Sequence, residues 1–218
     1  MDSSYSKPTP VIDSDSRPVE AKARELTRGV EDPCEASTAL FYFVRDRVRY
    51  NLYVSKSRPE DFRASSTLLR GEGYCVQKAV LLVALARAAD IPAALGFARL
   101  RNHLLPEKTR EWLGGDILPF HGYAELYLNG RWVKATPAFD AAMCEKHRII
   151  PVEFDGTEDA VFHPHNREGK PHIEYLEDLG HLCQDLPFDR LRQVLVESLG
   201  ERALEPPPRG SYRRPPMG

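Results

Sequence analysis

The sequence predicts an α+β domain in which helices come first along the chain and an antiparallel sheet follows. The segment from Tyr74 to Asp90 is rich in Ala and Leu and has no internal Gly or Pro, which predicts a helix. Asn129-Gly130 separates two strand-like segments, and this dipeptide favours the two-residue type I′ turn of a hairpin. Because the expected strands are joined by turns and not by helical crossovers, we expect the sheet to be antiparallel.

The first helix has a well-marked beginning. Asp32 can cap it, Pro33 suits its first position, and Glu35 stands where a capping box places an acidic residue. The apolar positions that follow repeat at helical spacing and are Leu40, Phe43, Val44 and Val48. We therefore expect a helix from about residue 33 to residue 48.

The remaining elements follow from turn signals and periodicity. Gly71 predicts the end of a short helix, Ile91-Pro92 ends the long helix, and Trp112 falls in a long loop. After the first helix and the segment 50–54, the expected elements in chain order are a helix 65–70, a strand 93–98, a hairpin of 121–128 with 131–135, a turn at 155–156 between short strands, and an amphipathic helix 188–199.

Length and composition favour one domain between two polar tails. The chain has 218 residues, and eight of its 18 prolines lie in the segments 1–20 and 205–218, which hold few apolar residues. Such segments cannot bury enough apolar surface to fold, so we expect disordered tails at 1–20 and 205–218 around a catalytic domain at 21–204.

Charge and hydropathy exclude several classes of partner. The net charge is −2, which lacks the basic field of most nucleic-acid-binding proteins. The longest apolar stretch, Ala79 to Ala86, is far shorter than the roughly 20 residues of a membrane-spanning helix. The first residues are polar and contain no apolar signal region. We therefore expect a cytoplasmic protein that binds neither nucleic acid nor membrane; its oligomeric state stays open.

The four cysteines, Cys34, Cys75, Cys144 and Cys183, include no Cys-x-x-Cys pair. They are too few for a disulfide framework and wrongly spaced for a structural zinc site. Four histidines between His163 and His181 also match no standard zinc spacing. We expect no metal and no cofactor.

Cys75 stands where a nucleophile is favoured. It opens the long helix directly after Gly71-Glu72-Gly73-Tyr74, and a helix N-terminus offers free N–H groups and partial positive charge. Both effects favour the thiolate over the thiol and lower the pKa of a cysteine. The alternative is that Cys75 is simply a small apolar residue in a core helix.

A cysteine nucleophile needs a base, and His121 at the start of the hairpin is the candidate. Extending the hairpin pairing beyond its two-residue turn sets His121 opposite Ala138, with Thr136 and Asp140 as its diagonal neighbours. Either of those two side chains could then orient the imidazole. A purely structural histidine is the alternative.

Three segments resemble motifs of the transglutaminase-like cysteine enzymes. Residues 64–93, ASSTLLRGEGYCVQKAVLLVALARAADIPA, resemble the nucleophile segment, in which Gly-x-Cys opens an Ala/Leu-rich helix ending in an Ile-Pro-Ala turn. Residues 121–137, HGYAELYLNGRWVKATP, are similar to the second motif, His-x-aromatic-x-Glu with a Gly-x-Trp strand. Residues 41–50, FYFVRDRVRY, resemble the family's first helix. The resemblance implies a papain-like fold and a catalytic pair of Cys75 and His121.

The third catalytic residue departs from the family pattern. The family usually has an Asp four positions after the Trp, and here that position is Thr136. A threonine can accept a hydrogen bond but cannot stabilise an imidazolium with charge, whereas Asp140 can. We therefore assign the orienting role to Asp140. A Cys–His dyad, a domain without catalysis, and an ordinary loop carboxylate at Asp140 are the alternatives.

The residue types predict thiol-dependent acyl transfer on an amide or thioester. The backbone N–H of Cys75 would be one oxyanion donor, and the second would come from the region of Tyr50 to Tyr53 or from Tyr74. The substrate would be a peptide, a protein or an acyl thioester. The alternatives are an amide-forming enzyme that uses carrier-bound thioesters and a binding module without catalysis. Glu125 matches the family motif, although it could be only the cross-strand ion-pair partner of Lys134.

Overall fold

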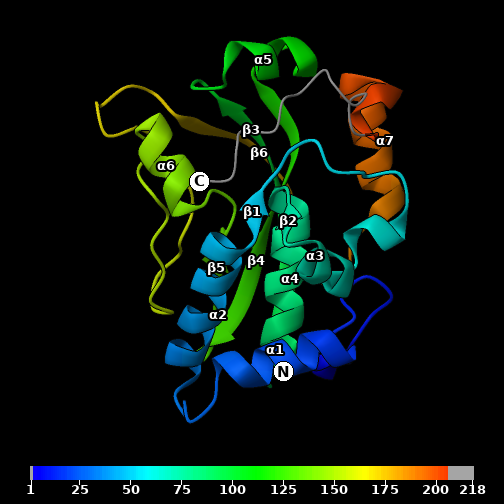
Figure 1. Ribbon diagram of the computed structural model, residues 1–218, viewed down its shortest axis with the longest axis vertical. Helices are drawn as coiled ribbons and strands as arrows, with labels where there is room; N and C mark the ends of the chain where they lie inside the picture. The colour runs from blue at the N-terminus through cyan, green and yellow to red at the C-terminus, as the bar shows by residue number, and fades with distance from the viewer. Residues whose placement is uncertain (1, 206–218) are drawn as a thin grey trace.

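A long apolar helix, α4 (Cys75–Ala88), lies at the centre of the molecule and carries Cys75 at its N-terminus (Figure 1). The computed structural model describes residues 2–205. Every residue of α4 from Cys75 to Arg87 is buried, as expected for a helix that is apolar on nearly all sides. The site is therefore built on one of the most completely enclosed elements of the protein.

One side of α4 packs on an antiparallel sheet of four strands in the order β5-β4-β3-β6. The strands are β3 (Ala93–Asn102), β4 (Ile117–Leu128), β5 (Arg131–Ala135) and β6 (Ile173–Cys183). The two central strands, β3 and β4, are almost fully buried, whereas much of β6 is exposed. Because β4 contacts α4 directly, the sheet sets the position of His121 relative to the nucleophile helix.

The other sides of α4 are covered by three helices from the first part of the chain, as Figure 1 shows. These are α1 (Arg17–Leu26), α2 (Pro33–Arg47) and α3 (Ala64–Arg70). Two further helices, α5 (Glu107–Leu113) and α6 (Ala141–His147), lie in the connections of the sheet, and α7 (Phe188–Leu199) follows it. Among residues 2–205, no helix is both long and apolar enough to cross a membrane.

Short elements complete the region around Cys75. The strands β1 (Arg49–Tyr50) and β2 (Glu72–Gly73) form a two-stranded parallel sheet just before α4. The short 3₁₀ helices are η1 (Ser3–Ser6), η2 (Pro59–Phe62) and η3 (Glu201–Ala203). Pairing of β1 with β2 fixes Tyr50 beside the loop that leads into Cys75.

The α+β fold and its main elements agree with the sequence expectations. Asp32 caps α2 by accepting a hydrogen bond from the Glu35 N–H at 3.1 Å, and Gly71 ends α3 at a φ of 67°. The hairpin has the expected register from Leu128 opposite Arg131 to Glu125 opposite Lys134. The closing helix α7 has the expected bounds.

Two expectations in the second half were wrong. The chain bends at Gly156, but among the described residues no strand of the sheet lies beside this bend. Strand β6, further along the chain, was not expected. The pairing of β6 with β3 shifts register three times, so its sequence lacks a regular alternation. The long loop containing Trp112 includes helix α5.

The expected disordered segment 1–20 is ordered from residue 2 onward. Val11, Ile12 and Val19 are buried, and α1 begins at Arg17. The Arg87 guanidinium donates to the Lys7 carbonyl at 2.7 Å, so a buried cation of α4 ties this segment down. A few apolar residues and backbone hydrogen bonds are enough to fix this segment, because it packs on the large apolar surface of α4. Of the expected tail 205–218, only Glu205 is described; residues 206–218 lie outside the described residues.

Candidate active site

The N-terminus of α4 is held in place by Gln77. Its side-chain oxygen accepts a hydrogen bond from the Tyr74 N–H at 3.2 Å, and its amide nitrogen donates to the Ser55 and Asp61 carbonyls at 3.1 and 2.8 Å. The glutamine thus caps the helix and fastens the preceding loop to it. This fixes Cys75 at the first position of a rigid helix.

Strand β4 approaches this helix end closely at Gly122. A Cβ atom at Gly122 would lie 2.9 Å from the Cα of Val76, so only glycine fits. The Gly122 N–H forms a hydrogen bond to the Cys75 thiol and lowers its pKa. Because this N–H belongs to the peptide that joins His121 to Gly122, the backbone of His121 lies against the candidate nucleophile.

The His121 side chain is enclosed by aromatic rings. It is 1% exposed, and its ring lies 5.0 Å from that of Phe162 and 6.4 Å from that of Tyr123. Neither imidazole nitrogen has a hydrogen-bond partner among the described residues. Burial lowers the pKa of His121 to about 3, so the ring is neutral at physiological pH.

The Cys75 thiol is also protonated in this structure, in contrast to the sequence expectation. Burial raises its pKa to about 11, although hydrogen bonds from the Gly122 and Val76 N–H groups and the charge of Lys56 lower it. The helix N-terminus was expected to favour the thiolate, but the loss of water around the sulfur is the larger effect. The structure therefore holds a thiol and a neutral imidazole.

Asp140 does not orient His121 in this structure. Its carboxylate caps α6 by accepting from the Met143 N–H at 2.8 Å and also accepts from the Tyr50 N–H at 3.4 Å. The extended hairpin pairing behind this assignment was wrong, because the arm leaves β4 after Ala135 and bonds to Ala160 instead. Thr136 does not orient the imidazole either, because neither nitrogen of His121 has a hydrogen-bond partner among the described residues.

A narrow pocket opens in front of Cys75. Its free volume is about 30 Å³, room for a few water molecules at most. Its wall is mostly apolar or aromatic and comprises Tyr50, Leu52, Lys56, Tyr74, Trp112, Leu113, Leu118, Pro119, Phe120, Leu195, Leu199 and Ala203, besides Cys75 itself. Burial beside Cys75 raises the pKa of Tyr50 and Tyr74, and the Tyr74 hydroxyl has no hydrogen-bond partner among the described residues.

The C-terminal segment 188–205 closes this pocket. Leu195 and Leu199 of α7 and Ala203 of η3 form part of its wall. The Lys56 N–H and the Ser57 hydroxyl donate to the Leu204 carbonyl at 2.7 and 3.2 Å. We call residues 188–205 the C-terminal cover.

Glu125, the acidic residue of the second motif, has a structural contact. Its carboxylate accepts a hydrogen bond from the Leu182 N–H at 2.8 Å, and burial raises its pKa. Lys134 is its cross-strand neighbour, but the Lys134 ammonium lies over the Tyr123 ring. Glu125 therefore ties β6 to the centre of the sheet.

Lys56, the one charged side chain on the pocket wall among the described residues, was not expected from the sequence. It lies in a polar stretch, Ser55 to Glu60, that reads as an exposed loop. No periodic pattern marks it, so nothing in the sequence separates it from a surface lysine. Its burial results from Trp112 and the C-terminal cover, both distant in sequence.

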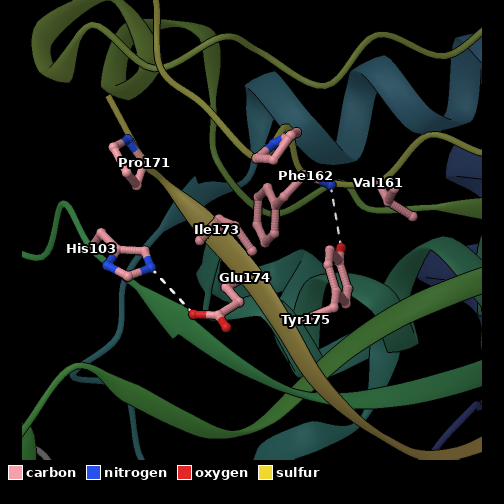
Figure 2. Close-up of a pocket in the computed structure, with 8 residues that line it drawn as sticks. His103, Val161, Phe162, Pro171, Ile173, Glu174 and Tyr175 are labelled. Carbon is pink, nitrogen blue, oxygen red and sulfur yellow. Dashed lines mark hydrogen bonds and ion pairs between the residues drawn. The ribbon is translucent and has the colours of Figure 1, made fainter. Parts of the chain in front are cut away.

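A second, larger cavity of about 480 Å³ lies at the surface near the start of β6 (Figure 2). Phe162 lines it and also packs against His121. His103 pairs with Glu174 at 3.4 Å, and the Tyr175 hydroxyl accepts a hydrogen bond from the Phe162 N–H at 3.3 Å. Neither Cys75 nor His121 lines this cavity. Among residues 2–205, no group of three His, Cys, Asp or Glu side chains is arranged to hold a metal ion.

Comparison with known proteins gives the family but little about the reaction. A presumed cysteine protease from Cytophaga hutchinsonii superposes with a TM-score of 0.47 and 23% identity, covering 61% of this chain and 40% of its own. A presumed protease from Parabacteroides distasonis gives a TM-score of 0.39 and 14% identity, covering 58% of this chain and 26% of its own. This chain thus spans less than half the length of either.

No curated protein matches the chain. The family described as the transglutaminase-like superfamily matches residues 20–137, more than half of the 218 residues. The matched region contains both α4 with Cys75 and the β4–β5 hairpin with His121. The chain belongs to the transglutaminase-like superfamily.

Proposed function

We propose that this protein is a cysteine enzyme that transfers acyl groups from an amide or thioester through a thioester on Cys75. Membership in the superfamily supports an enzyme that works through a cysteine. The observation that carries the proposal is the contact of the His121–Gly122 peptide with the Cys75 sulfur. This contact between the backbone of one motif and the cysteine of the other supports a Cys75–His121 pair, and Cys75 lines a pocket whose wall is mostly apolar or aromatic.

The proposed reaction has two steps. His121 takes the proton of the Cys75 thiol, the sulfur bonds to the acyl carbon, and the bond from that carbon to the amine or thiol breaks. His121 returns the proton to the leaving group. Water or an amine then attacks the thioester, the carbon–sulfur bond breaks, and the Cys75 thiol is restored.

A backbone donor favours the first step. The N–H group of Cys75 lies at the start of α4, where no earlier turn of the helix uses it. It can bind the oxyanion of the tetrahedral intermediate. The Tyr74 hydroxyl, buried in the pocket and without a hydrogen-bond partner among the described residues, is our candidate for the second donor.

The acceptor and the compartment are part of the proposal. Water would make the enzyme a hydrolase and an amine would make it a transamidase; a peptide, a protein or a carrier-bound thioester would be the acyl donor. All four cysteines are free, which suits a reducing compartment such as the cytoplasm. A binding module without catalysis is the second candidate, favoured by the absence of a hydrogen-bonded carboxylate at His121.

Acyl trapping tests the proposal directly. The protein is incubated with an aromatic acyl thioester and analysed by intact-mass spectrometry. We expect one added acyl group on the wild type and on Cys144→Ala, none on Cys75→Ala, and acylation slowed by roughly 10²-fold or more in His121→Ala. Cys144 is the matched control because it is a second buried thiol whose pKa burial raises to about 11. Acylation that persists in Cys75→Ala would overturn the proposal.

A further inference from the structure

Lys56 is a buried cation on the wall of the Cys75 pocket. The residue is 2% exposed, and its ammonium donates to the Leu52 and Val54 carbonyls at 2.6 and 2.9 Å. It lies 5.0 Å from the centre of the Tyr74 ring and 5.9 Å from that of Trp112. Two carbonyls and two aromatic faces hold the ammonium group in place but supply no full negative charge.

A buried charge without a counter-charge is unfavourable, and Lys56 has no carboxylate partner among residues 2–205. A carboxylate close by in sequence, that of Asp61, instead accepts hydrogen bonds from the Ser55 hydroxyl and the Ser57 and Arg58 N–H groups. The group whose charge acts on Lys56 is the sulfur of Cys75. The pocket thus pairs a cation with a group that is anionic only when it is a nucleophile.

We propose that Lys56 is an electrostatic positioning residue whose ammonium group stabilises the thiolate of Cys75. This inference rests on the proposed function, since it concerns the reactive form of that nucleophile. Lys56 would supply the positive charge that His121 cannot hold by itself in this structure, because no carboxylate is hydrogen-bonded to the imidazole. The cation is fixed by backbone carbonyls, so it needs no rearrangement when the thiolate forms.

The other titratable groups around the sulfur do not offer this charge. Tyr50 and Tyr74 face Cys75 from β1 and from the start of α4, and burial raises the pKa of both phenols, so they stay neutral. Burial lowers the pKa of His121 to about 3. Burial also lowers the pKa of Lys56, to about 8, which leaves it charged at neutral pH and neutral above that value. The stabilisation is therefore expected below about pH 8 and lost above it.

The test compares a neutral and an anionic alkylating reagent at Cys75. Rates with iodoacetamide and iodoacetate are measured by peptide mass spectrometry from pH 5 to 10. In the wild type, the rate ratio of iodoacetate to iodoacetamide is expected to fall through about pH 8 as Lys56 loses its proton. In Lys56→Met the fall disappears, and the iodoacetamide rate at Cys75 at pH 7 drops by about tenfold, because fewer thiolates form without the ammonium charge. In Lys56→Arg the rate at pH 7 is retained and no step occurs near pH 8, because a guanidinium stays charged.

Arg87→Met is the matched control. Arg87 is another buried cation that donates to backbone carbonyls, and it lies 12 positions further along α4, about 18 Å from Cys75 at 1.5 Å per residue. Its removal should leave the Cys75 profile unchanged even if it destabilises the fold. If Lys56→Met does not fold, the pH step of the wild type and its absence in Lys56→Arg still show whether the charge of Lys56 acts on Cys75.

An unchanged iodoacetamide rate at pH 7 in folded Lys56→Met, or no step in the wild type, would overturn the role of Lys56. These measurements use no acyl donor. If acyl trapping fails but the pH step at Lys56 is observed, the proposed function is rejected and the role of Lys56 stands. If acyl trapping succeeds but the pH step is absent, only the role of Lys56 is rejected.

Discussion

At the scale of single residues, the site depends on one close approach. Gly122 lets β4 touch the start of α4, and a methyl group there would meet the backbone of Val76 and not a flexible side chain. We expect Gly122→Ala to lower the free energy of unfolding by about 1 to 3 kcal/mol and to slow acylation of Cys75, because the strand must move away. Urea unfolding and acyl trapping measure the two effects. Gly115→Ala, where no atom lies within 4 Å of the added carbon, is the control and should change neither.

Asp140 supports a second prediction at this scale. As the cap of α6, it can be replaced by Asn with little effect, whereas Asp140→Ala should lower the free energy of unfolding by about 1 kcal/mol. Neither variant should shift the pH midpoint of Cys75 alkylation. A clear shift in Asp140→Asn would instead restore the catalytic role that the sequence suggested.

At the scale of elements, the C-terminal cover controls access to Cys75. The pocket has room for a few water molecules at most, so an acyl donor needs α7 and η3 to move. We expect Leu199→Asp, which puts a charge on the apolar wall, to raise the iodoacetamide rate at Cys75 by about tenfold or more near pH 9. Gln193→Asp adds the same charge on the exposed side of α7 and should leave the rate unchanged. Equal rates in the two variants would contradict this role of the cover.

Elements with strong local signals could be predicted from the sequence. Helix α4 has a continuous apolar composition, α2 has Asp32 as its cap, and the hairpin has Asn129-Gly130 at its turn. Each of these signals lies within the element that it predicts. Strand β6 could not be predicted because its outer face is polar and its period is broken at Gly180 and Leu182, which have positive φ.

The candidate site was predictable only in part, for the same reason. Cys75 and His121 each lie in a local motif, so the sequence indicates them. The environment of His121 depends on Phe162, and that of Lys56 on Trp112 and Leu204, which are distant in the chain. The burial that raises the pKa of Cys75 is a tertiary property, and no local pattern carries it.

At the scale of the whole molecule, buried histidines make stability depend on pH. His172 is fully buried between Phe139 and Phe162, and burial lowers its pKa to about 4. Its unfolded pKa is about 6.5, so between these values the unfolded chain binds a proton that the folded protein does not. Stability should therefore fall as the pH drops below about 6.5, by up to roughly 1.4 kcal/mol per pH unit for this one group.

Urea unfolding of the wild type and of His172→Phe between pH 7 and 4.5 tests whether the free energy of unfolding falls with pH as expected. The variant should lose stability less steeply as the pH falls, with His121 still contributing in the same direction. Parallel curves for the two proteins would mean that the folded protein accommodates the proton on His172.

The hydrogen bond from Ser57 to Leu204 joins residues 147 positions apart, and this separation bears on synthesis of the chain. A ribosome adds about 5 to 20 residues per second, and a domain generally folds as a unit. The helices around α4 and the β4–β5 hairpin are complete by residue 135, whereas the cover begins at residue 188. The pocket at Cys75 therefore cannot close until the ribosome has made this later part of the chain, on the order of several seconds after the hairpin.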